Sequence, residues 1–303
     1  MVEYGPILVT GGNSGIGRAV TAMLAARGHL VYATARRESG LRALEHLPNV
    51  DPIKLDVTKP VTIEKAVEAV NKRGRGLYGL VNNAGTGVAW PLQALDVEDM
   101  ISDFDVNVFG VHRVTKAMLP FLVRSKGRVV NVTSIAGLAT SKYLGAYCMT
   151  KHALEAYSET LARWLKKYGV RVSVVEPGTY RSEITKKAQV RIPRMIQGHK
   201  EKLFRKDVQE IAEWYPKAVW SAAREPRPEA IPIAVADALF SRRPRFRYCP
   251  CAYKGELTWA VEGPIVRSVQ ANLGGDRFSM SREELHSMLD KTWDKEDHRL
   301  KRS

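Results

Sequence analysis

The apolar positions of this chain fall into short β-branched runs separated by longer stretches with helical periodicity. The runs lie at residues 6–10, 28–35, 50–55, 77–85, 127–134, 170–176 and 245–249. Short apolar runs are typical of strands buried on both faces, and the amphipathic segments between them predict helices. This alternation predicts an α/β fold, a doubly wound parallel sheet of about seven strands with helices on both faces.

The rest of the pattern predicts one domain with a tail. A continuous helix is expected over residues 97–124, and residues 183–225 are helical, basic and rich in Met, Trp and Phe, as expected for a lid over a substrate. The sequence contains no repeat, low-complexity tract or linker, so residues 1–250 are assigned to one domain that includes the lid. Residues 251–303 form a C-terminal extension, in which Ser281-Arg-Glu-Glu is expected to cap a helix.

A glycine-rich turn follows the first strand and precedes an amphipathic helix that extends to about residue 27. Glycines let the backbone approach a pyrophosphate closely, and the helix amino terminus supplies amide donors and a positive dipole. The turn therefore predicts a phosphate-binding βα unit of the Rossmann type. Its candidate cofactor-binding residues are Gly11, Asn13, Ser14, Gly15, Ile16 and Gly17.

The tip of the second strand indicates which dinucleotide is bound. An acidic residue at this position would bind the ribose hydroxyls of NAD and repel the additional phosphate of NADP. Here Ala35 is followed by Arg36 and Arg37, whose guanidinium groups suit a 2′-phosphate, and Glu38 comes too late to bind the ribose. The alternative is a solvated Arg pair at a strand end. We expect NADP(H) in preference to NAD(H).

Polar and small residues also end the third, fourth and sixth strands, at the edge where a dinucleotide lies. The residues after the third strand are placed to contact adenine, and the alternative role of Asp56 among them is to cap a helix. The residues after the fourth strand leave space for the ribose and the nicotinamide. The Pro-Gly turn after the sixth strand is expected to meet the nicotinamide carboxamide, with hydroxyl side chains as partners. These candidates are Asp56, Val57, Asn83, Ala84, Gly85, Pro177, Gly178, Thr179 and Ser182.

Candidate catalytic groups lie at the end of the fifth strand and on the helix after it. Ser134 ends the strand, and Tyr147 and Lys151 are spaced i to i+4, which places them on one face of the helix. An ammonium favours the phenolate and is expected to lower the pKa of the tyrosine, so that it can move a proton to or from an oxygen held by the serine. Taken alone, Tyr-x-x-x-Lys also describes an ordinary amphipathic helix turn.

In this order and spacing, the motifs are similar to those of the short-chain dehydrogenase/reductase family. The resemblance covers about residues 5–250. It rests on Gly11-x-x-x-Gly15-x-Gly17, Asn82-Asn-Ala-Gly85, Asn107, Ser134, Tyr147-x-x-x-Lys151 and Pro177-Gly178.

The resemblance implies hydride transfer between nicotinamide C4 and a carbonyl or alcohol carbon. Tyr147 would be the general acid in reduction and the base in oxidation, and Ser134 would hold the substrate oxygen. Lys151 would lower the pKa of Tyr147 and bind the nicotinamide ribose, so that Tyr147 and Lys151 also belong to the cofactor site. Asn107 would hold a water that links Lys151 to solvent.

The chain departs from the family pattern at several positions. Ser14 stands where many members have Lys or Arg, which leaves more of the 2′-phosphate contact to Arg36 and Arg37, in the manner of the NADP-preferring branch. Ser182 replaces the usual Thr and keeps a hydroxyl. The tail is similar to that of members acting on steroids or retinoids, and residues 31–36 are similar to 17β-hydroxysteroid-type enzymes.

The expected substrate is a bulky apolar ketone or alcohol. Aromatic and apolar residues near the expected site, together with the aromatic-rich lid, favour a carbonyl reductase or a steroid- or retinoid-type alcohol dehydrogenase. The candidate substrate residues are Trp90, Ser134, Leu138, Tyr143 and Tyr147. The alternative is a catalytically idle NADP(H)-sensing regulatory protein on the same fold.

Composition narrows the class of protein. The chain of 303 residues is 45% hydrophobic and 26% charged, with a net charge of +15. Its basic residues are scattered and no nucleic-acid motif accompanies them, so we expect no nucleic-acid partner. The three cysteines are too few for a disulfide framework, and Cys249-x-Cys251 lacks a second pair for zinc, so no metal is expected.

The sequence also leads to expectations about the cellular location and the oligomeric state of the protein. No apolar run approaches the roughly 20 residues of a membrane span, and no signal peptide is visible before the first strand, so we expect a cytoplasmic protein without a transmembrane segment. Peripheral membrane contact through the basic, partly aromatic tail stays open. The family habit implies a homodimer or homotetramer through the helices around residues 97–124 and 145–168.

Overall fold

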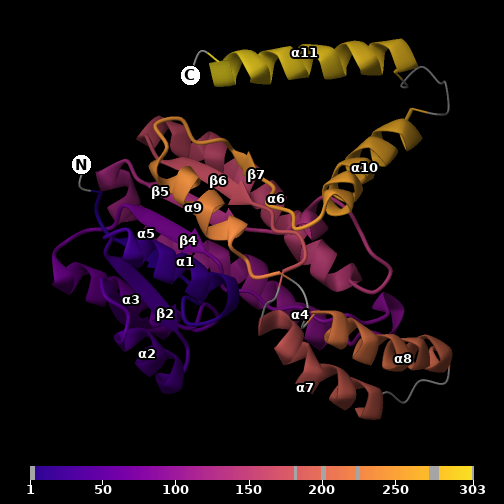
Figure 1. Cartoon of the computed structure of the whole chain (residues 1–303), viewed down its shortest axis with the longest axis horizontal. Coiled ribbons are helices and arrows are strands. Elements are labelled where there is room, and N and C mark those ends of the chain that lie inside the picture. The colour runs from indigo at the N-terminus through magenta and orange to yellow at the C-terminus, as the bar shows by residue number, and fades with distance from the viewer. Residues whose placement is uncertain (1–3, 181–182, 199–202, 223–225, 273–279, 302–303) are drawn as a thin grey trace.

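The structure is a computed structural model that describes residues 4–180, 183–198, 203–222, 226–272 and 280–301. Its centre is a seven-stranded sheet in the order β3-β2-β1-β4-β5-β6-β7, in which every pair of neighbours is parallel (Figure 1). The prediction of a doubly wound parallel sheet is therefore confirmed. The strands are β1 (Ile7–Val9), β2 (Val31–Ala35), β3 (Val50–Lys54), β4 (Gly79–Asn82), β5 (Arg128–Val132), β6 (Arg171–Val175) and β7 (Arg247–Tyr248).

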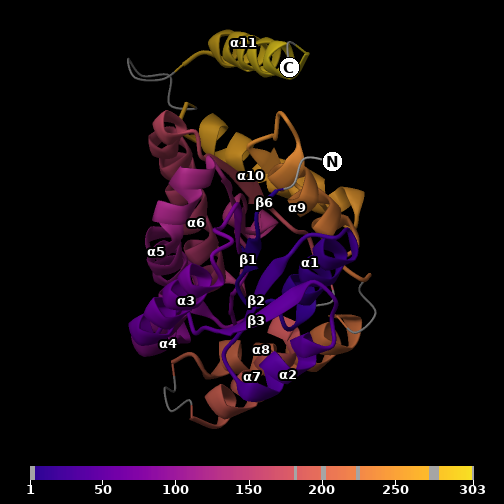
Figure 2. The same cartoon turned by 90° about the vertical axis from the view of Figure 1, so that its left-hand side faces the viewer.

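Helices cover both faces of the sheet, which is seen edge-on between them in Figure 2. One face packs against α1 (Gly15–Ala26), α2 (Glu38–Glu45) and α9 (Ala230–Phe240). The other packs against α3 (Pro60–Arg73), α5 (Gly110–Ser125) and α6 (Gly145–Leu165). Because both faces are covered, the strands are apolar at nearly every position, which is the pattern that made them recognisable in the sequence.

The strand order reverses direction between β1 and β4. The chain moves outward in one direction from β1 to β3 and in the other from β4 to β7. In open parallel sheets, ligands bind at the carboxyl ends of the strands where such a reversal occurs. The turn after β1 and the segments after β4, β5 and β6 all end at this edge.

The helix predicted over residues 97–124 is not continuous. It is interrupted by a π-helical turn over Asp105–Phe109, which separates α4 (Val97–Phe104) from α5. Such turns insert one extra residue per turn and often accompany functional sites. The interruption places Asn107 inward, with 1% of its surface exposed.

Two further groups of helices complete the fold. The predicted lid contains α7 (Glu183–Gly198) and α8 (Arg205–Ala222), and the C-terminal extension contains α10 (Lys254–Gln270) and α11 (Arg282–Lys301). The predicted cap of the last helix is confirmed, because Ser281 N donates to Glu284 Oε2 at 2.7 Å and Glu284 N donates to Ser281 Oγ at 3.2 Å. Short helical turns occur at Leu92–Ala94, Ile135–Gly137 (η3) and Lys166–Tyr168. Within the described residues, no helix combines the length and apolar character needed to cross a membrane.

Candidate active site

The structure brings Ser134, Tyr147 and Lys151 together at the carboxyl edge of the sheet. Ser134 follows β5 and caps η3, where its Oγ accepts a hydrogen bond from Ala136 N at 3.1 Å. Tyr147 and Lys151 lie one turn apart on α6, with the Lys151 Nζ 5.6 Å from the centroid of the Tyr147 ring. The ammonium donates to the Val132 carbonyl at 3.1 Å, so the end of β5 fixes its position.

Burial dominates the electrostatics of this pair. It raises the pKa of the Tyr147 phenol to about 12, and the interaction with the Ser134 hydroxyl offsets only part of this effect. Burial also lowers the pKa of Lys151 to about 8, against the opposing influence of the Glu155 carboxylate. The expected lowering of the pKa of Tyr147 is therefore not met in this structure, because burial outweighs the interactions that favour the phenolate. The phenol keeps its proton at neutral pH.

A cluster of carboxylates lies behind Lys151. Arg247 on β7 binds Glu155 (Nη1 to Oε2, 2.5 Å), Glu159 (Nη2 to Oε1, 2.6 Å) and Glu176. Glu155 and Glu176 are buried, and burial together with the charge of Glu155 raises the pKa of Glu176 to about 7. In the described part of the chain, Glu155 Oε1 has no hydrogen-bond partner. No local pattern in the sequence indicates this cluster, because Arg247 lies 92 residues from Glu155 in the chain.

Asn107 connects the segment after β4 to α6. Its Oδ1 accepts from Thr86 N at 2.9 Å, and its Nδ2 donates to Thr86 O at 2.7 Å and to Thr150 Oγ1 at 3.0 Å. Thr150 Oγ1 in turn donates to the Tyr147 carbonyl at 2.8 Å. Gly87 lies against the phenol ring, because a Cβ there would be 2.5 Å from Tyr147 Cδ2. The side chain of Asn107 thus holds this wall of the site, and its role in a proton relay stays a prediction.

The glycine-rich turn has the geometry that a phosphate cradle requires. Gly11 and Gly15 have φ angles of 63° and 51°, in the left-handed region that favours glycine. A Cβ on Gly17 would be 2.2 Å from the Gly11 carbonyl oxygen and 2.4 Å from Asn83 Nδ2. Ser14 precedes α1 and makes no side-chain capping bond to it, so that side chain does not use the first amides of the helix.

Thr10 at the end of β1 organises the neighbouring strand ends, although the sequence analysis did not single it out. Its Oγ1 accepts from Asn83 N at 2.9 Å and from Ala84 N at 3.0 Å, and its carbonyl accepts from Asn83 Nδ2 at 3.0 Å. The predicted cofactor residues Asn83 and Ala84 are therefore fixed directly beside the glycine turn. A hydroxyl between an apolar strand and a glycine turn is the signal that could have identified Thr10.

The residues at the predicted adenosine end differ in their contacts. Arg36 and Arg37 are exposed at the tip of β2, and within the described residues no ion pair includes either of them. Glu38 is instead bound to Lys54 Nζ at 2.5 Å. Asp56 Oδ1 accepts from Thr58 N at 3.0 Å and from Thr58 Oγ1 at 2.8 Å, which closes a turn before α3 and does not cap the helix, whose N-cap residue is Lys59.

Two other predicted cofactor contacts, one for adenine and one in the glycine turn, are placed by packing. Val57 is buried, and a Cβ on Gly110 would be 2.6 Å from its Cγ2. Asn13 lies beside the start of α2, because a Cβ on Gly40 would be 2.8 Å from Asn13 Nδ2. The glycine turn therefore reaches the residues that follow β2.

The Pro177–Thr179 segment lies beside the segment that carries Ser134. The Pro177 carbonyl accepts from Ile135 N at 3.2 Å, and Gly178 N donates to the Pro250 carbonyl at 3.1 Å. Thr179 is exposed, whereas its backbone N–H donates to Glu256 Oε1 at 2.6 Å. The predicted contact Ser182 lies outside the described residues.

Two predicted substrate residues are engaged with the lid. Trp90 is only 3% exposed, and it packs in an apolar cluster with Ile192, Val208 and Ile211 of α7 and α8. The Tyr143 hydroxyl donates to Glu210 on α8. These contacts fix α8 to the body of the protein, and they give both aromatic residues a packing role that the sequence did not reveal.

The third candidate, Leu138, is half-buried in the segment after Ser134. Its carbonyl accepts a hydrogen bond from Arg267 Nη2 of α10 at 2.8 Å. Contact of its side chain with a substrate stays a prediction.

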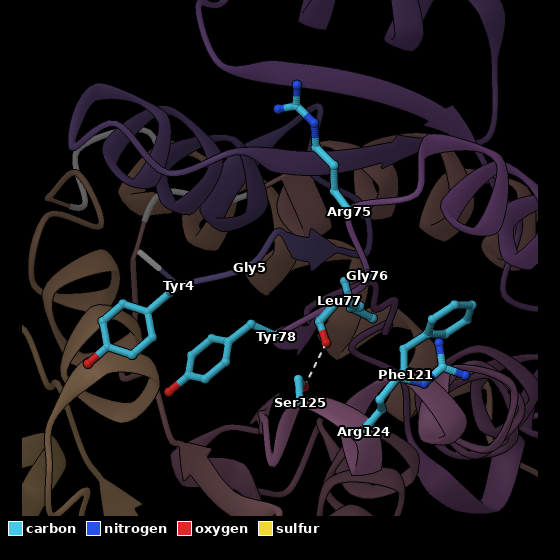
Figure 3. Close-up of a pocket in the computed structure, with 9 residues that line it drawn as sticks. All are labelled: Tyr4, Gly5, Arg75, Gly76, Leu77, Tyr78, Phe121, Arg124 and Ser125. Carbon is cyan, nitrogen blue, oxygen red and sulfur yellow. Dashed lines mark hydrogen bonds between the residues drawn. The ribbon is translucent and has the colours of Figure 1, made fainter. Parts of the chain in front are cut away.

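A cavity of about 430 Å³ lies at the opposite edge of the sheet (Figure 3). Its walls come from the segment before β1, the turn between α3 and β4, and the end of α5. The lining residues are Tyr4, Gly5, Arg75, Gly76, Leu77, Tyr78, Phe121, Arg124 and Ser125. None of these residues belongs to the predicted site, and the cavity is at the amino ends of the strands rather than beside Tyr147.

Comparison with known proteins gives a consistent result. The profile of a family described as short chain dehydrogenase matches residues 6–192. Retinol dehydrogenase 5 of Mus musculus is 33% identical over 267 residues, which cover 84% of this chain and 82% of that protein. 17-beta-hydroxysteroid dehydrogenase type 6 of Homo sapiens is 39% identical over 200 residues, 64% of this chain and 62% of that protein. The crystal structure of a short-chain dehydrogenase from Streptomyces avermitilis superposes with a TM-score of 0.70 at 28% identity, covering 89% of this chain and 95% of that one.

Proposed function

Because this chain belongs to the short-chain dehydrogenase family, whose matched relatives are oxidoreductases, we propose that it transfers a hydride between NADP(H) and a carbonyl or secondary alcohol group of a bulky apolar substrate. The observation that carries the proposal is the placement of Ser134, Tyr147 and Lys151 at one sheet edge. The glycine turn is at the same edge. Proton transfer and dinucleotide binding are therefore combined in one site.

The residues present fit a dinucleotide. Within the turn from Gly11 to Gly17, Gly17 lies so close to the Gly11 carbonyl that there is no space for a Cβ. The amide groups at the start of α1 lie at the same end of the sheet. When bound, the cofactor supplies or accepts the hydride. The protein supplies the proton and holds the reacting oxygen.

In the reductive direction, Tyr147 donates its proton to the carbonyl oxygen while the Ser134 hydroxyl holds that oxygen by a hydrogen bond. The raised pKa of the phenol suits this role, because the proton remains bound until negative charge develops on the oxygen. The ammonium of Lys151 favours the phenolate that remains after the transfer. Alcohol oxidation would use the same groups in reverse, with the deprotonated phenol accepting the proton of the alcohol.

The preference for NADP(H) is supported by the two exposed guanidinium groups at the tip of β2 and by the engagement of Glu38 with Lys54. We expect Arg36→Asp to lower the ratio of kcat/KM for NADPH to that for NADH by about tenfold to a hundredfold, since a charged hydrogen bond to the 2′-phosphate is lost. Arg42→Asp on α2 is the matched control, because it makes the same charge change at a residue that is not assigned to the cofactor, and it should leave the ratio within about twofold. An unaltered protein that already uses NADH better would contradict the assignment.

An apolar substrate is supported by the matched relatives, which are named for retinol and a hydroxysteroid. We expect NADPH to be oxidised in the presence of bulky cyclic or long-chain ketones and much more slowly with small polar ones. The measurement is the loss of NADPH absorbance across a panel of ketones. A protein that binds NADPH and reduces none of them would contradict the proposal and favour the sensing alternative.

A further inference from the structure

The amino-terminal half of α10 is connected to the segment after β6. Glu256 Oε1 accepts a hydrogen bond from Thr179 N at 2.6 Å, and its Oε2 accepts from Ala252 N at 3.0 Å and from Tyr253 N at 3.2 Å. A Cβ on Gly178 would be 2.3 Å from Glu256 Oε2, so only glycine lets the carboxylate lie this close. One side chain thus caps α10 and holds the Pro177–Thr179 segment.

The other half of α10 is connected to the segment after Ser134. Gly263 lies where a Cβ would be 2.9 Å from the Leu138 carbonyl oxygen and 3.1 Å from Ala139 Cα. Arg267 Nη2 donates to the same carbonyl at 2.8 Å, and its Nη1 is 3.5 Å from His152 Nε2. His152 directly follows Lys151 on α6.

These contacts come from one face of the helix. Glu256, Ala260, Gly263 and Arg267 are spaced i, i+4, i+7 and i+11, which is the repeat of a single helical face. Ala260 is fully buried, and the small residues at the centre allow close approach, while the charged residues at the ends make the polar contacts. One helix therefore spans the two segments that flank the candidate site.

We propose that α10 is a structural part of the active site, in which Glu256 and Arg267 are positioning residues that set the distance between the Pro177–Thr179 and Ser134–Leu138 segments. The inference rests on the proposed function, because Ser134 is assigned there to the substrate oxygen and the Pro177–Gly178 turn is the predicted contact of the nicotinamide carboxamide of the same cofactor. Neither residue touches the reacting atoms. The C-terminal extension then determines how closely the carbonyl group approaches the cofactor.

Substitutions at Glu256 distinguish this role from simple helix capping. Glu256→Gln places an amide NH₂ against backbone N–H donors, and we expect the Kd for NADPH to rise by about tenfold. Glu256→Asp keeps the charge and can still cap α10, but it is one methylene too short to reach Thr179 N. We expect it to weaken NADPH binding to a similar degree. Glu262→Gln, at an exposed position of the same helix, should leave the Kd unchanged.

Arg267→Met keeps the apolar stem of the side chain and removes its hydrogen bonds. We expect kcat for a ketone at saturating NADPH to fall by about tenfold, with the Kd for NADPH changed by less than about twofold. The double variant Glu256→Gln/Arg267→Met should be non-additive, since one helix joins the two segments that these residues hold.

Hydrogen exchange provides a readout that does not depend on turnover. In the full-length protein, we expect amides of residues 177–180 to exchange faster in Glu256→Gln and Glu256→Asp, and those of residues 134–140 to exchange faster in Arg267→Met, with the Tm lowered by no more than about 4 °C. If the unaltered protein lacked reductase activity while these exchange differences appeared, the proposed function would fail and the positioning role would stand. If Glu256→Asp matched the unaltered protein in both Kd and exchange, Glu256 would be only a helix cap and the proposal would be overturned.

Discussion

Tyr147→Phe is expected to reduce kcat for ketone reduction by about a thousandfold while leaving the Kd for NADPH within about threefold. The change removes one oxygen and keeps the ring, so the contact of the ring with Gly87 is preserved. No other phenol within the described residues is placed beside both Ser134 and Lys151. The proton would then have to come from water, which is a poorer and unpositioned donor. Steady-state kinetics with a ketone and NADPH fluorescence titration measure the two quantities separately.

The matched control is Tyr157→Phe, which removes a phenolic hydroxyl from the same helix. Tyr157 is directed toward Thr115 and His112 rather than toward Ser134. The Tyr157→Phe variant should retain nearly full activity, with a slightly lower Tm. A Tyr147→Phe enzyme with a third or more of the original kcat would show that the phenol is not the proton donor. A cellular effect that survives Tyr147→Phe would instead favour a sensing role.

Local features of the sequence were sufficient to predict the fold. Val129 and Val130 on β5 and Val174 and Val175 on β6 are fully buried, and their side chains face helices on both sides of the sheet. A run of apolar residues is the direct consequence of that burial. The catalytic candidates were found for a similar reason, since each depends on a short spacing along the chain and on its place at a strand end or helix start.

Features that depend on distant contacts could not be predicted. The π-helical turn around Asn107 is stabilised by bonds to Thr86 and Thr150, which are 21 and 43 residues away in sequence. Glu256 meets Thr179 across 77 residues, and Arg267 meets Leu138 across 129. The i to i+4 spacing correctly placed Tyr147 and Lys151 on one face. It did not reveal how deeply both groups are buried, and so the expected direction of the pKa shift of the phenol was wrong.

Of the substitutions proposed here, Arg191→Met should lower the free energy of unfolding most, because it breaks the ion pairs that fix α7 to α4. Arg191 Nη1 is 2.8 Å from Asp103 Oδ1, and its Nη2 is 2.7 Å from Asp99 Oδ1. Asp103 is fully buried, and burial raises the pKa of its carboxyl group despite the nearby guanidinium. Removal of Arg191 leaves this carboxylate buried without a counter-charge. We expect the free energy of unfolding to fall by about 3 kcal/mol, measured by urea denaturation, with a Tm lower by about 8 °C.

The companion variant Asp103→Asn tests whether the uncompensated charge is the cause. In the double variant Arg191→Met/Asp103→Asn no buried charge remains, so most of the lost stability should return. Because the pKa of Asp103 rises further when Arg191 is absent, the single variant should also approach the unaltered protein in stability as the pH is lowered and the carboxyl group becomes protonated.

Arg194→Met, at an exposed position of the same helix, should change the free energy of unfolding by less than about 0.5 kcal/mol. If the double variant were as unstable as Arg191→Met alone, the loss would come from the packing of the Arg191 stem against α4, and the ion pairs would not be what holds α7 in place.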